Sequence, residues 1–152
     1  MPVDIRRACA EDIPQLLSLI RRYWDFEGIE GFAALRIEVL LKELLAGPPE
    51  RGLIWVAESQ RALVGYLIAV LLFSLEHGGL MAEVDELFVL PQARSAGIGT
   101  QLLSAAEADL AQRGCVRSQL QLATGNSGGR AFYERHGYGE RADYRLLEKP
   151  LR

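Results

Sequence analysis

The sequence is poor in cysteine and has no long apolar run, and these absences argue against disulfide-rich, zinc-binding and membrane-spanning proteins. Cys9 and Cys115 are its two cysteines. They are too few for a disulfide framework or a zinc site, so we expect two buried small side chains and no metal. The longest uncharged apolar run covers residues 62–73, whereas a membrane-spanning helix needs about 20 residues. The first residues are too charged for a secretory signal, so we expect a cytoplasmic protein without membrane contact.

The charge balance is slightly acidic, with 17 Lys and Arg against 20 Asp and Glu and a formal net charge of −3. A general nucleic-acid binder needs a basic face, so this balance argues against that class of protein. With 49% hydrophobic and 24% charged residues, the composition is that of a globular chain. We expect one domain over residues 1–152, large enough to bury a core of its own.

Hydrophobic periodicity predicts strands and helices in a mixed order. Alternating apolar residues predict strands, helical spacing predicts helices, and Gly or Pro marks the breaks between them. The predicted strands cover residues 2–7, 53–58, 62–73, 80–89 and 116–122, with a final strand or hairpin partner over 138–151. Four helices are predicted. The first begins at residue 12, and the second runs through Phe32, Leu35, Val39 and Leu40. The other two cover residues 97–113 and 127–135. This order predicts an α/β fold in which a mixed sheet has helices on both sides.

The most informative stretch is a strand that runs through a glycine turn directly into a helix. Gly97 and Gly99 stand at the predicted helix start, and Arg94 precedes them on the same turn. Main-chain N–H groups at a helix N-terminus form an anion site, and glycine lets a phosphate approach the backbone. Arginine adds bidentate phosphate contact. The alternative is a tight turn with close packing of the helix on the strand.

Two other phosphate-binding loops do not fit this stretch. A dinucleotide fingerprint needs G-x-G-x-x-G, and the third glycine is absent. A Walker loop needs a lysine after the last glycine, and no lysine follows Gly99.

The pattern Arg94-x-x-Gly97-x-Gly99 fits the [QR]-x-x-G-x-[GA] pyrophosphate loop of the GNAT N-acetyltransferase superfamily, which the chain resembles. A second family element also appears, because the segment from Asn126 to Tyr138 resembles N-x-x-A-x-x-[FL]-Y-x-x-x-G-[FY]. The resemblance covers essentially the whole chain and implies the GNAT acyl-CoA N-acyltransferase fold, in a single domain, with acetyl-CoA as cofactor.

One departure from the family pattern is visible. Gly129 stands where the family has a small alanine, inside Gly125-Asn-Ser-Gly-Gly129. A helix that starts with two glycines is weaker by roughly 1 kcal/mol for each, so we expect its first turn to be frayed without acyl-CoA.

The resemblance also implies which residues contact the cofactor. Asn126 resembles the residue that hydrogen-bonds the pantetheine arm, although a plain helix N-cap has the same sequence. The family stabilises the oxyanion with a backbone N–H of the strand before the loop, which falls at Leu87. The full cofactor-binding set is Leu87, Phe88, Val89, Arg94, Ser95, Ala96, Gly97, Ile98, Gly99, Thr100, Asn126 and Tyr133.

Acetyl transfer from a thioester to an amine needs a neutral amine, a stabilised oxyanion and a proton for the departing thiolate. Tyr133 occupies the family position of the proton donor, and a phenol of pKa near 10 suits a thiolate of pKa about 8.5. The alternative is that Tyr133 only packs against the cofactor. No Cys–His pair suggests an acyl-enzyme, so direct attack in a ternary complex is the simpler mechanism.

Three carboxylates on the predicted strand 80–89 are the remaining catalytic candidates. Strict alternation puts Glu83 and Asp85 on one face of the strand and Glu86 on the other. In polyamine-acetylating relatives of the family an acidic pair falls at Asp85-Glu86, and in histone-type members the base falls at Glu83. The sequence does not choose among the three, and a salt bridge or an exposed strand end is the alternative for each.

The first helix region adds an aromatic and acidic stretch, Tyr23-Trp-Asp-Phe-Glu27, which follows that helix where the family places a wall of the acceptor pocket. Such a wall suits an organic cation. We therefore expect an acetyltransferase acting on a small cationic primary amine, with a peptide or protein N-terminus as the second choice. A non-catalytic acyl-CoA sensor is the alternative, and a homodimer is compatible with the sequence.

Overall fold

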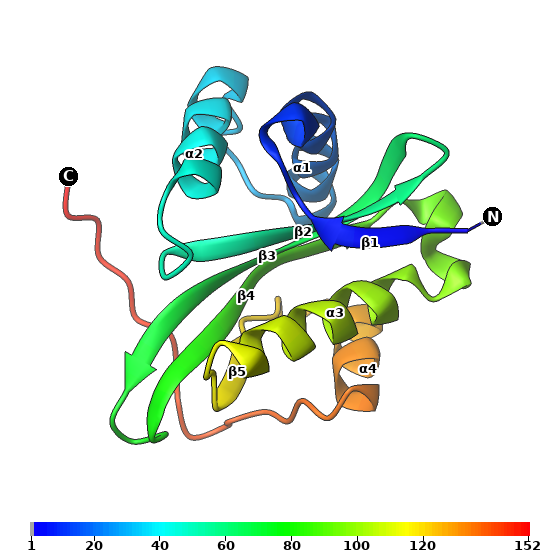
Figure 1. The fold of residues 1–152 in the computed structure, drawn as a ribbon. Helices are drawn as coiled ribbons and strands as arrows, with labels where there is room; N and C mark the ends of the chain where they lie inside the picture. Colours follow the sequence, from blue (N-terminus) through cyan, green and yellow to red (C-terminus); the bar gives the residue numbers. More distant parts are fainter. Residues whose placement is uncertain (1) are drawn as a thin grey trace. The chain divides into compact units, whose positions relative to one another are not determined.

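The computed structural model describes residues 2–152 and divides the chain into two compact units, one ending at Gln121 and one covering Leu122–Arg152. The first unit holds the sheet (Figure 1). Its strands are β1 (Asp4–Arg7), β2 (Gly52–Ser59), β3 (Ala62–Ser74), β4 (Gly79–Val89) and β5 (Arg117–Leu120). Its helices are η1 (Ala10–Asp12), α1 (Ile13–Glu27), α2 (Ala34–Ala46), η2 (Pro91–Ala96) and α3 (Ile98–Gln112).

The five strands lie in the order β1-β2-β3-β4-β5, with antiparallel pairing up to β4 and a parallel β4–β5 pair. Helices α1 and α2 cover one face of this sheet, and α3 covers the other (Figure 1). Leu16 and Ile20 of α1 and Leu41 of α2 join the buried core beneath the first pair of helices. Leu102 and Leu103 of α3 are fully buried as well. The mixed sheet with helices on both faces confirms the predicted α/β fold class.

Most of the predicted elements of this unit are present within a few residues of their predicted ends. The hairpin between β2 and β3 turns at Gln60 and Arg61, which both adopt positive φ, 52° and 66°. Two central residues in this conformation form the tight turn that matches the twist of paired strands. The strand predicted over 116–122 is shorter, since β5 covers four residues.

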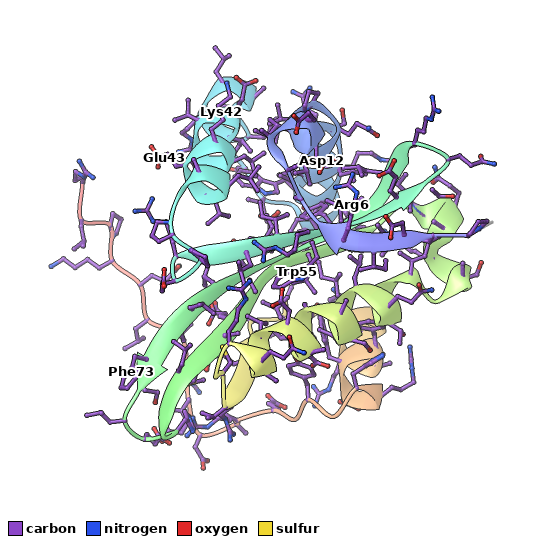
Figure 2. All side chains as sticks on the ribbon, viewed as in Figure 1. Arg6, Asp12, Lys42, Glu43, Trp55 and Phe73 are labelled. Carbon is purple, nitrogen blue, oxygen red and sulfur yellow. The ribbon has the colours of Figure 1, made fainter. Side chains whose placement is uncertain are left out.

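A partly buried ion pair fixes the start of α1 to the edge strand β1. Arg6 donates two hydrogen bonds to the carboxylate of Asp12, at 2.8 and 2.9 Å, and a third to Glu58 on β2 at 2.8 Å. Figure 2 labels Arg6 and Asp12, which lie near each other between β1 and the start of α1. The guanidinium of Arg6 lowers the pKa of Asp12, which is 5% exposed. A bidentate pair of this kind holds the N-terminus of α1 in one orientation.

The helix predicted through Leu35, Val39 and Leu40 is present as α2, but other residues of it face the core. Leu35 is 81% exposed and Val39 53% exposed, whereas Ile37 and Leu41 are buried at 7% and 4%. Residues four apart lie on one side of a helix, so the two pairs mark opposite sides of α2. Both sides carry apolar residues, and periodicity alone does not choose between them.

The expectation of two buried cysteines is also wrong. Cys9 is exposed and Cys115 is half-buried. Cys9 precedes η1, where its backbone N–H donates to the Asp12 carboxylate at 2.8 Å. Its backbone is therefore held at a turn on the surface, where the side chain has no core to enter.

The second unit contains α4 (Ser127–Arg135), which has the bounds that the sequence predicts. The segment after it forms no strand, so the strand predicted over 138–151 is wrong. Tyr144 and Leu146 stand on either side of the charged Arg145, which is a strand-like pattern, yet both are more than half exposed. Pattern alone does not form a strand, because a strand also needs a neighbouring strand to pair with.

Candidate active site

Strand β4 contains a bulge at the acidic cluster. Ile68 of β3 pairs with Glu86 and the next residue, Ala69, pairs with Val84, so Asp85 is an extra residue on β4. A bulge bends its strand, increases the local twist and re-aims the side chains around it. The three carboxylates therefore lie at the one irregular position of the β3–β4 ladder that the structure shows among the described residues.

The bulge reverses the predicted distribution of the carboxylates. Val70 pairs with Glu83 and Ile68 pairs with Glu86. Residues paired across antiparallel strands point to the same face, and residues two apart on β3 share a face. Glu83 and Glu86 therefore share one face, which corrects the prediction that placed Glu86 opposite Glu83. Alternation failed because it assumes a regular strand.

Glu86 is held by two hydrogen bonds from different elements. The indole Nε1–H of Trp24 on α1 donates to its Oε2 at 2.9 Å, and the hydroxyl of Tyr66 on β3 donates to its Oε1 at 2.8 Å. Burial raises the pKa of Glu86, the two donors act against this rise, and the charge of Asp85 adds to it. Burial raises the pKa of the Tyr66 phenol, and the charge of Glu86 raises it further, so the phenol stays protonated and donates. The network fixes one carboxylate orientation on the α1 face.

The other two carboxylates have different surroundings. Glu83 accepts a hydrogen bond from Gln119 of β5 at 2.7 Å, and Gln121 adds a longer one of 3.4 Å. Asp85, at the bulge, keeps an exposed side chain. Desolvation by the surrounding groups raises the pKa of Asp85, and the charge of Glu83 raises it further. Glu86 is thus the most strongly oriented of the three.

Aromatic rings surround the Glu86 network. The ring of Tyr23 meets Tyr66 and Phe88 edge-on, with centroids 6.5 and 5.9 Å apart. Trp24 makes a similar contact with Phe32 at 5.6 Å. The stretch from Tyr23 to Glu27 forms the last turns of α1, rather than following that helix as the sequence suggested. The predicted wall therefore exists as a helix end that contacts β4.

The glycine turn has the geometry of an open helix N-terminus. Pro91–Ala96 form one 3₁₀ segment, and Gly97 then adopts φ 74° and ψ 18° as the residue before α3. A Cβ at Gly97 would meet no atom within 4 Å, so glycine is required there by its conformation and not by crowding. The amides of Ile98 and Gly99 belong to the first turn, where N–H groups lack intrahelical acceptors and attract anions.

Arg94 is the positive charge on this turn, and its guanidinium makes three contacts within the protein. Its Nε donates to the carbonyl oxygen of Val89 at 2.9 Å. Its Cζ lies 5.2 Å from the ring centroid of Phe26 and 5.5 Å from that of Phe88. These contacts connect the loop to both α1 and β4. The bond to Val89 uses one of the five guanidinium N–H donors, so the two terminal nitrogens keep their donors for another partner.

The backbone of Leu87 points away from β3. The N–H of Leu90 donates to the carbonyl of Val64 at 2.8 Å. Hydrogen bonding alternates along an antiparallel pair, so the amides of residues 90, 88 and 86 face β3 and that of Leu87 faces the opposite edge. That edge pairs with β5 from Met81 to Val84. Leu87 lies three residues beyond this pairing.

The remaining predicted cofactor-binding residues of this unit fall into two groups. The side chains of Phe88 and Ile98 are buried, at 5% and 2% exposure, so they belong to the core. Ser95, Ala96 and Thr100 are exposed on the turn and the first turn of α3.

The second motif lies in the second unit. Asn126 caps α4, with its Oδ1 accepting from the N–H of Gly129 at 2.9 Å. The ring of Tyr133 lies 5.1 Å from that of Phe132 and 5.6 Å from that of Tyr138. All three aromatic side chains are half-buried. The first turn of α4 is thus formed and capped in the structure.

Residues 2–152 contain no cluster of three or more His, Cys, Asp and Glu side chains that could hold a metal ion. None of their helices is long and apolar enough to cross a membrane.

Comparison with known proteins decides the family. A sequence model described as the acetyltransferase (GNAT) family matches residues 13–138. The chain belongs to the GNAT acetyltransferase family. This confirms the resemblance drawn from the two motifs, and with it the expectation of an acyltransferase enzyme.

Individual relatives agree with this assignment. The chain is 30% identical to the aminoalkylphosphonate N-acetyltransferase of Salmonella typhimurium, over 91% of this chain and 86% of that one. It is 30% identical to the aminoglycoside N(6')-acetyltransferase type 1 of Klebsiella aerogenes, over 73% and 76%. The structure of the aminoglycoside N-acetyltransferase AAC(6')-Iy in complex with CoA superposes with a TM-score of 0.84 and 18% identity, covering 99% and 95% of the two chains. That last likeness shows the fold.

The structure adds partners that sequence reasoning missed. Tyr66 lies in an apolar strand and was not singled out, although a hydroxyl inside such a run signals a buried hydrogen bond. Gln119, which holds Glu83, gave no signal in the sequence. Phe26 was assigned to the acceptor wall, and the structure places it against Arg94.

Proposed function

We propose that this GNAT enzyme transfers the acetyl group of acetyl-CoA to the primary amine of a small cationic acceptor, by direct attack in a ternary complex. The observation that carries the proposal is the carboxylate of Glu86, oriented by Trp24 and Tyr66 among aromatic rings. An anionic group next to aromatic faces attracts an organic ammonium ion. The named activities of the relatives in Salmonella and Klebsiella, on an aminoalkylphosphonate and an aminoglycoside, support an amine acceptor.

The residues of the glycine turn fit the diphosphate of acetyl-CoA. Gly97 leaves the backbone uncovered, the first amides of α3 attract an anion, and Arg94 supplies a positive charge on the same turn. The bound acetyl-CoA would supply an activated acetyl thioester. A cytoplasmic location is part of this proposal, because the reaction draws on metabolic acetyl-CoA.

Glu86 is our candidate for the group that binds the acceptor ammonium and takes up its proton, directly or through a water molecule. Each of its oxygens accepts one hydrogen bond and has a second lone pair for the substrate. Glu83 is a weaker candidate, because Gln119 and Gln121 already engage its two oxygens. Asp85 adds negative charge beside Glu86 without the same fixed orientation.

Two further roles complete the proposal. The N–H of Leu87 would stabilise the oxyanion, which its direction away from β3 supports; in other acyl transferases such a donor is worth roughly 3 kcal/mol. The phenol of Tyr133 would protonate the departing thiolate, and Asn126 would contact the pantetheine arm. These last two roles rest on the second motif.

The test is an assay of thiol release from acetyl-CoA across a panel of polyamines, aminoglycosides, aminoalkylphosphonates and peptides with free N-termini. We expect release that saturates with a small cationic amine. Thiol release with peptides alone would indicate that the acceptor is a peptide or protein N-terminus. Saturable acetyl-CoA binding without release on any amine would favour a sensor, and no binding would reject the proposal.

A further inference from the structure

The last turn of α1 contacts both parts of the candidate active site. Trp24 donates to Glu86, and two residues later the ring of Phe26 covers the guanidinium of Arg94. Phe26 is 60% exposed, so its ring is not needed to fill the core. The guanidinium of Arg94 also lies 5.5 Å from the ring centroid of Phe88, which is buried. Arg94 is therefore in contact with a ring of α1 and a ring of β4.

We infer that Phe26 is a positioning residue for the phosphate site: it holds Arg94 in place before the diphosphate binds. This inference rests on the proposed use of acetyl-CoA. It gives the exposed ring a role toward the cofactor, in addition to any role as a wall for the acceptor.

The physical reason is the conformational freedom of arginine. A free arginine side chain samples many rotamers and loses that freedom when it binds a phosphate. Two ring contacts and the Nε bond to Val89 restrict Arg94 in advance. A ligand that meets an already ordered side chain does not have to order it, so its affinity rises.

The effect of Phe26 should depend on its π face. A cation over an aromatic ring at an exposed site gains about 0.5–1 kcal/mol, which corresponds to about a two-fold to five-fold change in affinity. Leucine keeps much of the apolar bulk and removes the ring, whereas tryptophan keeps a stronger π face. The pair Phe26→Leu and Phe26→Trp therefore separates the ring contact from plain packing.

The experiment is calorimetric titration of coenzyme A into the wild type and a small set of variants. Phe26→Leu should weaken the affinity about two-fold to five-fold, and Phe26→Trp should retain or improve it. The control is Phe73→Leu, an exposed phenylalanine near the end of β3 that lies apart from α1 (Figure 2), which should leave the affinity unchanged.

A double-mutant cycle with Arg94→Met identifies the partner. In the Arg94→Met background, Phe26→Leu should have no further effect, since the contact is already lost. In steady-state assays Phe26→Leu should raise the KM for acetyl-CoA and leave kcat unchanged. Thermal unfolding of each variant checks that the fold is intact.

The outcomes separate this inference from the proposed function. If the wild type binds no coenzyme A, the proposed function itself fails. If the wild type binds and Phe26→Leu binds equally well or more tightly, the positioning role is rejected and the function stands. A loss that persists in the Arg94→Met background would also reject it, because the effect would then not pass through Arg94.

Discussion

The two motif regions of the chain, residues 83–100 and 126–138, are held by the fold in different ways. The first runs along a central strand and into α3, and it contains the buried side chains of Val84, Phe88 and Ile98. The second lies in residues 122–152, all of which the structure describes, and none of them is buried. The sheet therefore fixes the first region before any ligand binds, whereas the second depends on a nine-residue helix and its cap.

The proposed site residues therefore divide into those on elements that build the core and those on a short helix outside it. Glu86, Arg94 and the amides after Gly97 belong to elements that also build the core. Tyr133 and Asn126 belong to a helix that is shorter than the roughly 12–15 residues at which isolated helices become even marginally stable in water. Substitutions in the first region should therefore change ligand binding without changing the local fold. Substitutions in the second should also change how well α4 is ordered.

The largest effect should come from Gly97→Asp, which changes the rigid region directly. Aspartate puts a negative charge at the positive end of α3 and a Cβ on a left-handed residue. We expect coenzyme A affinity to fall at least about 100-fold, as measured by calorimetry. The matched control is Gly114→Asp, at a left-handed glycine with equally open space after α3. An equal loss in both variants would attribute the effect to strain and not to the phosphate site.

The next largest effect is expected from Tyr133→Phe, which changes the second region. Tyr133→Phe removes the phenol and keeps the ring that packs against Phe132 and Tyr138. We expect kcat to fall at least about tenfold, because general acid catalysis contributes at this level or above, while acetyl-CoA affinity changes little. Steady-state kinetics and calorimetry together measure this. An unchanged kcat would remove Tyr133 as the acid and leave catalysis to the first region.

Glu86→Gln should lower kcat/KM for the amine about tenfold, since it removes the carboxylate that takes the proton. The pKa of Glu86 is raised from its ordinary value of 4.5 by burial. Activity should therefore fall with decreasing pH through this raised pKa, and the acidic limb should vanish in the variant. The pH profile of both enzymes measures this. Glu83→Gln is the control, and an equal loss there would contradict the choice of Glu86.

The same raised pKa sets the sign of a stability effect. A carboxyl whose folded pKa lies above its unfolded value contributes stability below the unfolded pKa and loses it as the pH rises through the folded one. Ionised Glu86 therefore costs stability at neutral pH, so Glu86→Gln should not lower the midpoint of thermal unfolding at pH 7.

The smallest effect concerns the two glycines at the start of α4. Gly128→Ala would meet no atom within 4 Å and should stabilise the helix by about 1 kcal/mol. Gly129→Ala would place its Cβ 2.7 Å from Nδ2 of Asn126 and must displace the cap. Hydrogen exchange of the Arg130 and Ala131 amides should slow in the first variant and change less in the second. Equal slowing in both would show that the Asn126 cap contributes little.

The sequence was informative where local chemistry decides the structure. The bounds of α4 and the turn at Gly97 follow from glycine and hydrophobic spacing, which act within a few residues. The family assignment followed from two motifs in the expected order, and the comparisons confirm it. Site roles drawn from these motifs are still predictions.

What the sequence did not predict depends on contacts far apart in the chain. The bulge at Asp85 is set by the register of β4 on β3, and a regular alternation cannot locate it. Trp24 and Tyr66 reach Glu86 from 62 and 20 residues away. The prediction of a strand after Tyr138 is wrong for a related reason, since strand pairing depends on a partner strand and not on the segment's own pattern.

The central claim is that main-chain amides at the start of α3, together with Arg94, bind the diphosphate of coenzyme A. Titration of ¹⁵N-labelled protein with coenzyme A, followed by two-dimensional amide spectra, tests it most directly. The account predicts that the amides of Gly97, Ile98 and Gly99 undergo the largest shifts and that the Arg94 side-chain N–H signals move with them. Saturable shifts elsewhere in the protein with these amides unmoved, or no shifts at all, would contradict it.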